Sequence, residues 1–182
     1  MTWVTHGSQT VYTNPWIEVR EDSVTGPGGA PGIYGVVTMR HPAVFVVALD
    51  DTDRVCLVTV ARYTTGTSIE VPAGGSDGED PESAARRELL EETGFEATEW
   101  TAIGRMNALN GIADAPEHVF LARGLRASDP EAAAEGQRDE GIGAVTWVPF
   151  ADALAMIADG RITDGETIAA IALAGIRLGR FR

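Results

Sequence analysis

Cysteine is nearly absent from this chain, and several other features that define whole classes of protein are missing as well. Cys56 is the single cysteine, so no disulfide can form within the chain. It lies in an apolar, strand-like run, which predicts a buried thiol and makes a reducing cytoplasm the simplest location. No apolar run approaches the length of a membrane span. The N-terminus has no basic segment followed by a hydrophobic stretch, so no secretory signal is expected.

Positive charge is also scarce. The chain carries 14 Lys and Arg residues against 27 Asp and Glu, which gives a formal net charge of -13. Nucleic acids and anionic lipids bind clustered basic residues, so neither is an expected partner. Apolar residues make up 44% of the 182 residues. That proportion predicts a packed core rather than disorder, and the length suits one ordinary domain.

The most informative stretch is an acidic helix. Asp80 is a typical N-cap residue, Pro81 suits the first helical position, and Gly94 lies where a C-terminal glycine stop belongs. Within this helix Glu88, Glu91 and Glu92 are spaced i, i+3 and i+4, so their carboxylates share one face. Like charges at that spacing cost roughly 0.2–0.5 kcal/mol per pair.

Two readings of this acidic face are open. A hard divalent cation, which takes oxygen ligands, would offset the repulsion. Alternatively, the face is simply solvated, with Arg86 and Arg87 as neighbouring charges. The residues before the helix favour the cation, because residues 72–79 form a glycine-rich loop whose backbone can approach a ligand closely.

This loop and helix together resemble the Nudix box of the Nudix hydrolase family. The run Arg87-Glu88-Leu89-Leu90-Glu91-Glu92-Thr93-Gly94-Phe95 matches the core of the motif, and seven residues separate Glu79 from Arg87, as the motif requires. One departure is visible, because only four residues separate Gly74 from Glu79 where the motif has five. Either Ala73 occupies the glycine position or the loop is one residue short.

The rest of the chain is similar to the ADP-ribose pyrophosphatase branch of that family. Val60-Ala61-Arg62-Tyr63 is similar to a strand end that carries an arginine, and Glu70-Val71-Pro72-Ala73-Gly74 to an E-x-PAG segment. By this resemblance Arg62 would contact the substrate phosphate, with Glu70 and Gly74 also on the substrate side. Two positions depart from the branch: Ile69 replaces a common aromatic, and Asn110 replaces a typical proline.

The resemblance also implies a metal site and a mechanism. Mg²⁺ or Mn²⁺ would be held by Glu88 and Glu92, with Glu91 and the Ala73 carbonyl assisting, and would reverse the sign of the local field for an anionic substrate. Arg87 would pair with a box glutamate and fix its rotamer. Glu140, or a box glutamate, would take a proton from the attacking water. Asp139 and Glu135 are weaker candidates for that role.

The implied reaction is hydrolysis of the diphosphate bond of a nucleoside diphosphate linked to another group, with ADP-ribose giving AMP and ribose 5-phosphate. Two alternatives remain open: a nucleotide sugar of the GDP-mannose type or an NTP as substrate, and a non-catalytic sensor of nucleotides. Base and sugar preference are expected to depend on residues 104–118. His118 lies in that segment, but a lone histidine at a strand start is more often structural.

The expected fold is an α/β/α sandwich with a mixed central sheet and an appended N-terminal antiparallel sheet. Residues 1–38 would form the appended strands and residues 39–182 the Nudix hydrolase domain. In the ADP-ribose pyrophosphatase branch such an N-terminal sheet is exchanged between subunits, which implies a homodimer. Residues 124–141 are expected to form a long acidic loop, and a closing helix is expected over residues 167–178.

Overall fold

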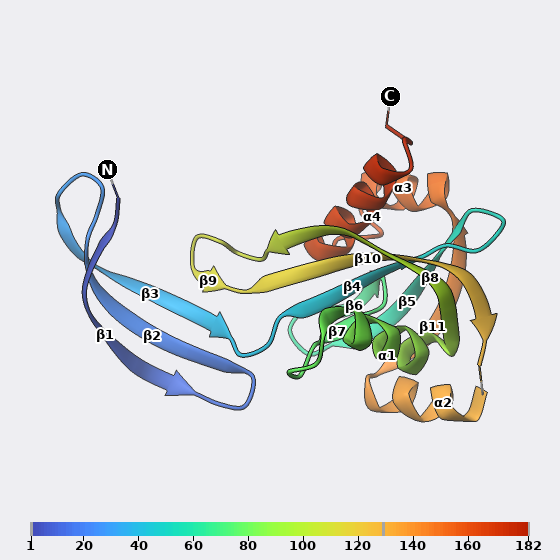
Figure 1. Ribbon diagram of the computed structural model, residues 1–182, viewed down its shortest axis with the longest axis horizontal. Coiled ribbons are helices and arrows are strands. Elements are labelled where there is room, and N and C mark those ends of the chain that lie inside the picture. The colour runs from blue at the N-terminus through green and yellow to red at the C-terminus, as the bar shows by residue number, and fades with distance from the viewer. Residues whose placement is uncertain (1, 129, 182) are drawn as a thin grey trace. The chain divides into compact units, whose positions relative to one another are not determined.

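The computed structural model describes residues 2–128 and 130–181. The chain divides into two compact units. The first comprises residues 1–42 and 106–117, and the second comprises residues 43–105 and 118–182. The elements of both are labelled in Figure 1.

The N-terminal unit is an antiparallel sheet that is completed by a distant segment. Its strands are β1 (Val4–Thr13), β2 (Ile17–Thr25), β3 (Pro31–Met39) and β9 (Ala113–Asp114), paired in that order. In the turn between β1 and β2, Oδ1 of Asn14 accepts hydrogen bonds from the N–H groups of Trp16 and Ile17. Strand β9 pairs parallel to β3. No local pattern in the sequence indicates this pairing.

The second unit contains two sheets. One has the strand order β7-β4-β10-β8 and the other β11-β5-β6. Their bounds are β4 (Ala43–Ala48), β5 (Arg54–Arg62), β6 (Gly66–Glu70), β7 (Ala73–Gly75), β8 (Phe95–Asn107), β10 (Pro116–Ala127) and β11 (Ile142–Pro149). Strand β4 is almost wholly buried, and in β5 residues 55–58 and Val60 are buried, as their apolar sequences predict.

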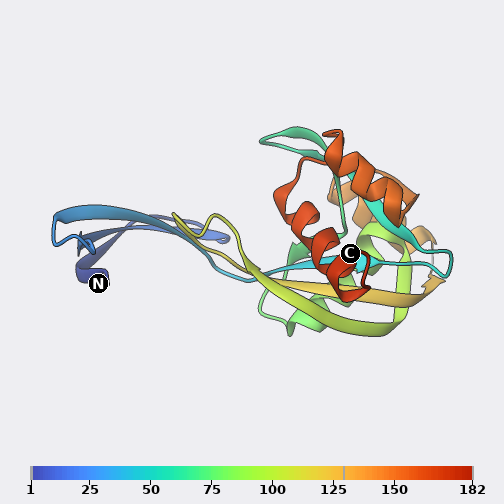
Figure 2. The same cartoon turned by 90° about the horizontal axis from the view of Figure 1, so that it is seen from above.

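Helices cover both faces of these strands. They are α1 (Pro81–Thr93), α2 (Pro130–Asp139), α3 (Phe150–Ala158) and α4 (Gly165–Arg177). Helices α1 and α4 both pack against β4, with α1 and α2 on one side of the strands and α3 and α4 on the other (Figure 1; Figure 2 gives the perpendicular view). The predicted α/β/α sandwich is confirmed. No helix in the described residues has the length and apolar composition needed to span a membrane.

The prediction of a long loop over residues 124–141 is wrong. Strand β10 continues to Ala127, and residues 130–139 form α2, which packs against α1. Gly136 explains the close contact, because a Cβ at that position would lie 2.9 Å from the Glu91 carbonyl oxygen. Gln137 ties the helices further by donating to the Glu92 carbonyl at 3.0 Å. The segment is rich in Ala and Glu, which favour a helix, and packing against α1 adds to its stability.

Candidate active site

Helix α1 carries the predicted functional face and begins and ends where the sequence indicated. Oδ2 of Asp80 accepts hydrogen bonds from the N–H groups of Glu82 and Ser83, at 3.1 and 3.3 Å. Gly94 adopts a left-handed conformation with φ of 75° and donates its N–H to the Leu90 carbonyl. These caps fix the phase of the helix, and with it the direction of the glutamates.

Two of the three box glutamates are buried. Glu88 and Glu92 are only 5% and 3% exposed, whereas the side chain of Glu91 is 44% exposed. Oε2 of Glu92 accepts the N–H of Ala73 at 3.0 Å, so the loop and the helix are joined directly at the predicted site. Gly74 closes over Glu88, because a Cβ at position 74 would lie 2.2 Å from Oε1 of Glu88. Only glycine leaves room for this carboxylate.

Burial changes the protonation of this pair. Burial raises the pKa of Glu92 to about 8, the N–H of Ala73 lowers it, and the neighbouring Glu88 raises it further. Burial likewise raises the pKa of Glu88 to about 7, although Arg87 opposes the shift. Two buried carboxylates side by side are costly as anions without a nearby cation. The carboxylate oxygens, and the cost of ionising both groups in a buried position, suit a hard divalent ion such as Mg²⁺ or Mn²⁺.

The third carboxylate does not join the buried pair. Nη1 of Arg87 donates to Oε1 of Glu88 at 2.8 Å and to Oε2 of Glu91 at 3.0 Å. Among the side chains that the structure describes, no group of three or more His, Cys, Asp or Glu residues is arranged so that it could hold a metal ion. A ligand set that includes Glu91 and the Ala73 carbonyl therefore stays a prediction.

Arg87 links the helix to the preceding loop. Besides its two glutamate partners, its Nη2 donates to the Gly75 carbonyl at 2.9 Å and its Nε lies 3.3 Å from Oε1 of Glu79. The expected pairing of Arg87 with a box glutamate is present. Burial works against the charged guanidinium, but Glu88 and Glu91 outweigh it and raise the Arg87 pKa above its ordinary value. Arg87 thus holds two carboxylates and the loop in one arrangement.

Arg62 and Glu70, both named from the sequence, form a bidentate ion pair. Nη2 of Arg62 lies 2.6 Å from Oε2 of Glu70, and Nε lies 3.1 Å from Oε1. Glu70 is 5% exposed. The hydrogen bond to Glu70 raises the pKa of Arg62, and burial of Arg62 lowers that pKa. The charges of Glu92 and Asp164 raise it further. The pair therefore lies within electrostatic range of the buried carboxylates.

The candidate bases lie near the end of α2. Glu140 is exposed and follows that helix, and its N–H donates to the Gly136 carbonyl at 2.9 Å. The negative charge of Glu140 contributes to the raised pKa values of both Glu88 and Glu92, so Glu140 lies within electrostatic range of the pair. Glu135 is exposed on α2 and contributes to neither pKa shift. The side chain of Asp139 lies outside the described residues.

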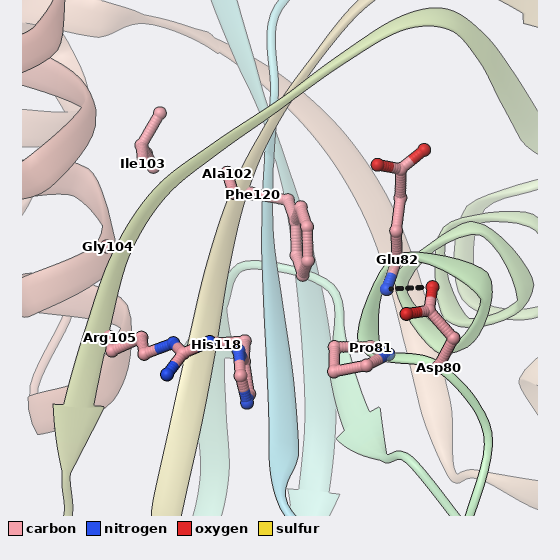
Figure 3. Close-up of a pocket in the computed structure, with 9 residues that line it drawn as sticks. All are labelled: Asp80, Pro81, Glu82, Ala102, Ile103, Gly104, Arg105, His118 and Phe120. Carbon is pink, nitrogen blue, oxygen red and sulfur yellow. Dashed lines mark hydrogen bonds between the residues drawn. The ribbon is translucent and has the colours of Figure 1, made fainter.

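His118 lines a cavity that does not include the buried carboxylate pair. This pocket, of about 600 Å³, is bounded by Asp80, Pro81 and Glu82 at the start of α1 and by β8 and β10. Figure 3 shows His118 next to Arg105, across open space from Pro81. Burial and the charge of Arg105 lower the His118 pKa, while Asp80 raises it. None of Glu88, Glu91 and Glu92 lines this pocket, so His118 does not join the carboxylate pair.

Some contacts at the site involve residues that sequence reasoning did not single out. Oγ1 of Thr167, at the start of α4, accepts the N–H of Val71 at 3.1 Å, and Asp164 caps the same helix. These residues position the segment that leads into Ala73. Thr167 is 96 residues from Val71, so no local pattern in the sequence could have indicated the contact.

The NUDIX domain family matches residues 39–171, and the nucleoside diphosphate sugar hydrolase N-terminal domain family matches residues 3–37. The chain belongs to the Nudix family and is a hydrolase.

Similar proteins carry related activities. An ADP-ribose pyrophosphatase of Mycobacterium tuberculosis (strain ATCC 25618 / H37Rv) is 35% identical over 94% of this chain and 80% of its own length. A GDP-mannose pyrophosphatase of Yersinia pestis (strain Pestoides F) is 38% identical, over 57% of this chain and 52% of its own length. A solved structure of an ADP compounds hydrolase has a TM-score of 0.82 and 20% identity, over 99% of this chain and 96% of that one. That structure supports the fold alone.

Proposed function

We propose that this protein hydrolyses the diphosphate bond of a nucleoside diphosphate linked to a second group, with ADP-ribose as the preferred substrate. The observation that carries the proposal is the buried Glu88–Glu92 pair beside the glycine-rich loop. The N–H of Ala73 donates to Glu92, and Gly74 has no Cβ that would displace the Glu88 carboxylate. The choice of ADP-ribose rests on similarity over nearly the whole chain to an enzyme of that name.

Glu88 and Glu92 would hold Mg²⁺ or Mn²⁺, with Glu91 and the Ala73 carbonyl assisting. When bound, the cation would neutralise charge on the diphosphate oxygens. Arg62 would contact a phosphate with the guanidinium N–H groups that Glu70 does not use. Arg87 would keep Glu88 and Glu91 in place, which is a positioning role.

Glu140 would complete the reaction as general base. It would take a proton from the attacking water while the water oxygen bonds to phosphorus and the bridging P–O bond breaks. For ADP-ribose the products are AMP and ribose 5-phosphate. The support for this role is the electrostatic reach of Glu140 to both buried carboxylates.

A nucleotide sugar of the GDP-mannose type is the second candidate substrate. The N-terminal family match and the 38% identical relative favour it, although that relative matches little more than half of this chain. A non-catalytic sensor is disfavoured, because all three box glutamates are present in the sequence.

The quaternary structure forms part of the same proposal. Residues 1–38 would be appended strands exchanged with a second copy, residues 39–182 the catalytic domain, and the homodimer would be cytoplasmic. The support is the number of large apolar side chains exposed on the N-terminal sheet, including Trp16 at 70% and Ile33 at 68%. Large exposed apolar surfaces commonly mark interfaces.

Product chromatography tests the proposal. The purified chain would be incubated with Mg²⁺ or Mn²⁺ and a panel of ADP-ribose, GDP-mannose, UDP-glucose, NADH, diadenosine polyphosphates and NTPs. Fastest release of AMP from ADP-ribose is expected. Preference for GDP-mannose would move the substrate assignment while keeping the chemistry, and no turnover of any compound would favour the sensor.

A further inference from the structure

A second cavity adjoins the Arg62–Glu70 ion pair. It has a volume of about 330 Å³ and lies between the β5–β6 hairpin and the start of α4. Hydroxyl side chains form much of its wall, from the hairpin turn at residues 64–65, from Ser68 and from Thr163. Asp164 contributes a carboxylate on the α4 side.

The charge around this cavity is negative on balance. Arg62 is already neutralised by its bidentate contact with Glu70, and Asp164 adds a further acid. Glu166 does not line the cavity but lies within electrostatic range of two acids that do. Burial raises the pKa of Glu166, and the charges of Asp164 and Glu70 raise it further. A phosphate group inside the cavity would be repelled, whereas a neutral ligand that donates hydrogen bonds would be favoured.

The lining also distinguishes among neutral ligands. None of the described residues that line the cavity is aromatic, so a nucleobase would find no ring to stack on. Serine and threonine hydroxyls both donate and accept, and carboxylates accept, which suits the hydroxyl groups of a sugar. The volume of about 330 Å³ has room for a sugar ring.

We propose that this cavity is a subsite for a sugar ring of the nucleoside diphosphate substrate, with Asp164, Ser68 and Thr163 binding its hydroxyl groups. The inference rests on the proposed function, because it requires a diphosphate bound nearby. Arg62 provides the connection: it lines the cavity and also lies within electrostatic range of Glu92. A sugar in the cavity would therefore lie next to a diphosphate bound by Arg62 and by the cation that Glu88 and Glu92 would hold.

Two substitutions test the subsite without disturbing the fold. Oδ2 of Asp164 caps α4 by accepting the Thr167 N–H at 2.7 Å, and asparagine is an equally good cap, so Asp164→Asn removes the charge while keeping the helix start. Ser68→Ala removes one hydroxyl from the cavity wall. Thr67→Ala is the matched control, since adjacent residues of β6 point to opposite sides of the strand and Thr67 does not line the cavity.

Binding is measured by calorimetry, so that the result does not depend on turnover. The ligands are α,β-methylene ADP-ribose, which cannot be cleaved at the bridging position, and its two analogues that each lack the 2-hydroxyl of one ribose. Asp164→Asn and Ser68→Ala are expected to weaken binding of the parent ligand by about tenfold, the effect of one lost hydrogen bond to a charged or hydroxyl group. The same substitutions should have a much smaller effect on one deoxy analogue, which identifies the ribose in the cavity.

The possible outcomes separate this inference from the proposed function. Equal weakening for all three ligands, or an equal effect of Thr67→Ala, would overturn the subsite while leaving hydrolysis of ADP-ribose intact. Selective weakening in a protein that does not hydrolyse ADP-ribose would support the subsite and refute the proposed activity.

Discussion

The N–H of Ala73 donates a hydrogen bond of 3.0 Å to Oε2 of Glu92, across 19 residues of chain. This bond joins the loop before α1 to the last turn of the helix. It also gives one oxygen of a buried carboxylate a partner, since the side chain is only 3% exposed. The loop and the helix therefore form one unit around Glu92, and a substitution in either should change the position of the Glu92 carboxylate.

The stability of the metal-free protein should fall as the pH rises. The folded-state pKa values of Glu88 and Glu92, about 7 and about 8, lie above the ordinary value of 4.5. For a group with a raised folded pKa, the stability is fully present below the unfolded pKa and is lost as the pH rises through the folded pKa, at about 1.4 kcal/mol per pKa unit. Calorimetric melting in EDTA should show a Tm that falls between about pH 4.5 and about pH 8 from this pair and changes little above that range.

Two comparisons control this prediction. Glu92→Gln should flatten the fall, because the amide carries no charge at any of these pH values. Added Mg²⁺ should raise Tm most at the alkaline end, where both carboxylates are ionised. A Tm that rises with pH in EDTA would contradict the burial of charge at this site.

Loss of the Arg87 guanidinium should weaken the site far more than loss of its neighbour. Arg87→Ala frees Glu88, Glu91 and the Gly75 carbonyl, so metal affinity and kcat should each fall by about 10- to 100-fold. Arg86 makes only an exposed pair with Glu82 and packs over Trp100. Arg86→Ala is therefore the matched control and should leave Mn²⁺ binding, measured by titration, almost unchanged. Equal losses in the two variants would show that Arg87 has no special positioning role.

A methyl group at position 74 should displace the Glu88 carboxylate. In Gly74→Ala the new Cβ would lie 2.2 Å from Oε1 of Glu88, which forces the side chain or the loop to move. Activity should fall by about 100-fold or more, since misplacement of about 1 Å in an active site can cost that much. Gly28→Ala meets no atom within 4 Å and serves as the control in the same steady-state assay. Normal kcat in Gly74→Ala would show that Glu88 tolerates a different position.

The general base can be assigned by comparing two acids of the same region. Glu140→Gln should lower kcat by about 100- to 10,000-fold while Mn²⁺ binding persists, because the variant loses a proton acceptor and no metal ligand. Glu135→Gln should leave both quantities near normal, since Glu135 contributes to neither raised pKa in the buried pair. A large loss only in Glu135→Gln would move the base to α2.

The sequence predicted the parts of the site that depend on local signals. Asp80 and Gly94 mark the ends of α1, and the spacing of Glu88 and Glu92 puts them on one face, as observed. Contacts between distant segments were not predictable in this way. The Thr167–Val71 hydrogen bond and the parallel pairing of β9 with β3 join residues far apart in the chain.

Helix α2 shows a different limit. Its sequence contains three Ala together with Glu, Gln and Arg, and Pro130 stands at the first helical position, so intrinsic preference favours a helix; the loop prediction rested on polarity and charge alone. Gly136 lowers the helix propensity but permits the close approach to α1, and packing against α1 adds to the stability of the helix. Arg62 and Glu70 are a third case, because both were named as substrate-binding residues but their ion pair was not predicted. In the pairing of β5 with β6, Arg62 lies opposite Gly66 and Glu70 opposite Val58, so the register alone does not bring the two side chains together.

The central claim, that the Glu88–Glu92 pair holds the metal for diphosphate hydrolysis, is tested most directly on Glu92→Gln. Mn²⁺ binding by electron paramagnetic resonance and release of AMP from ADP-ribose would be measured on the same sample. The account predicts that Mn²⁺ affinity falls by at least about 10-fold and turnover by about 1,000-fold, in a protein that melts no lower than the parent in EDTA at pH 8. Turnover and Mn²⁺ affinity close to those of the parent protein would contradict it.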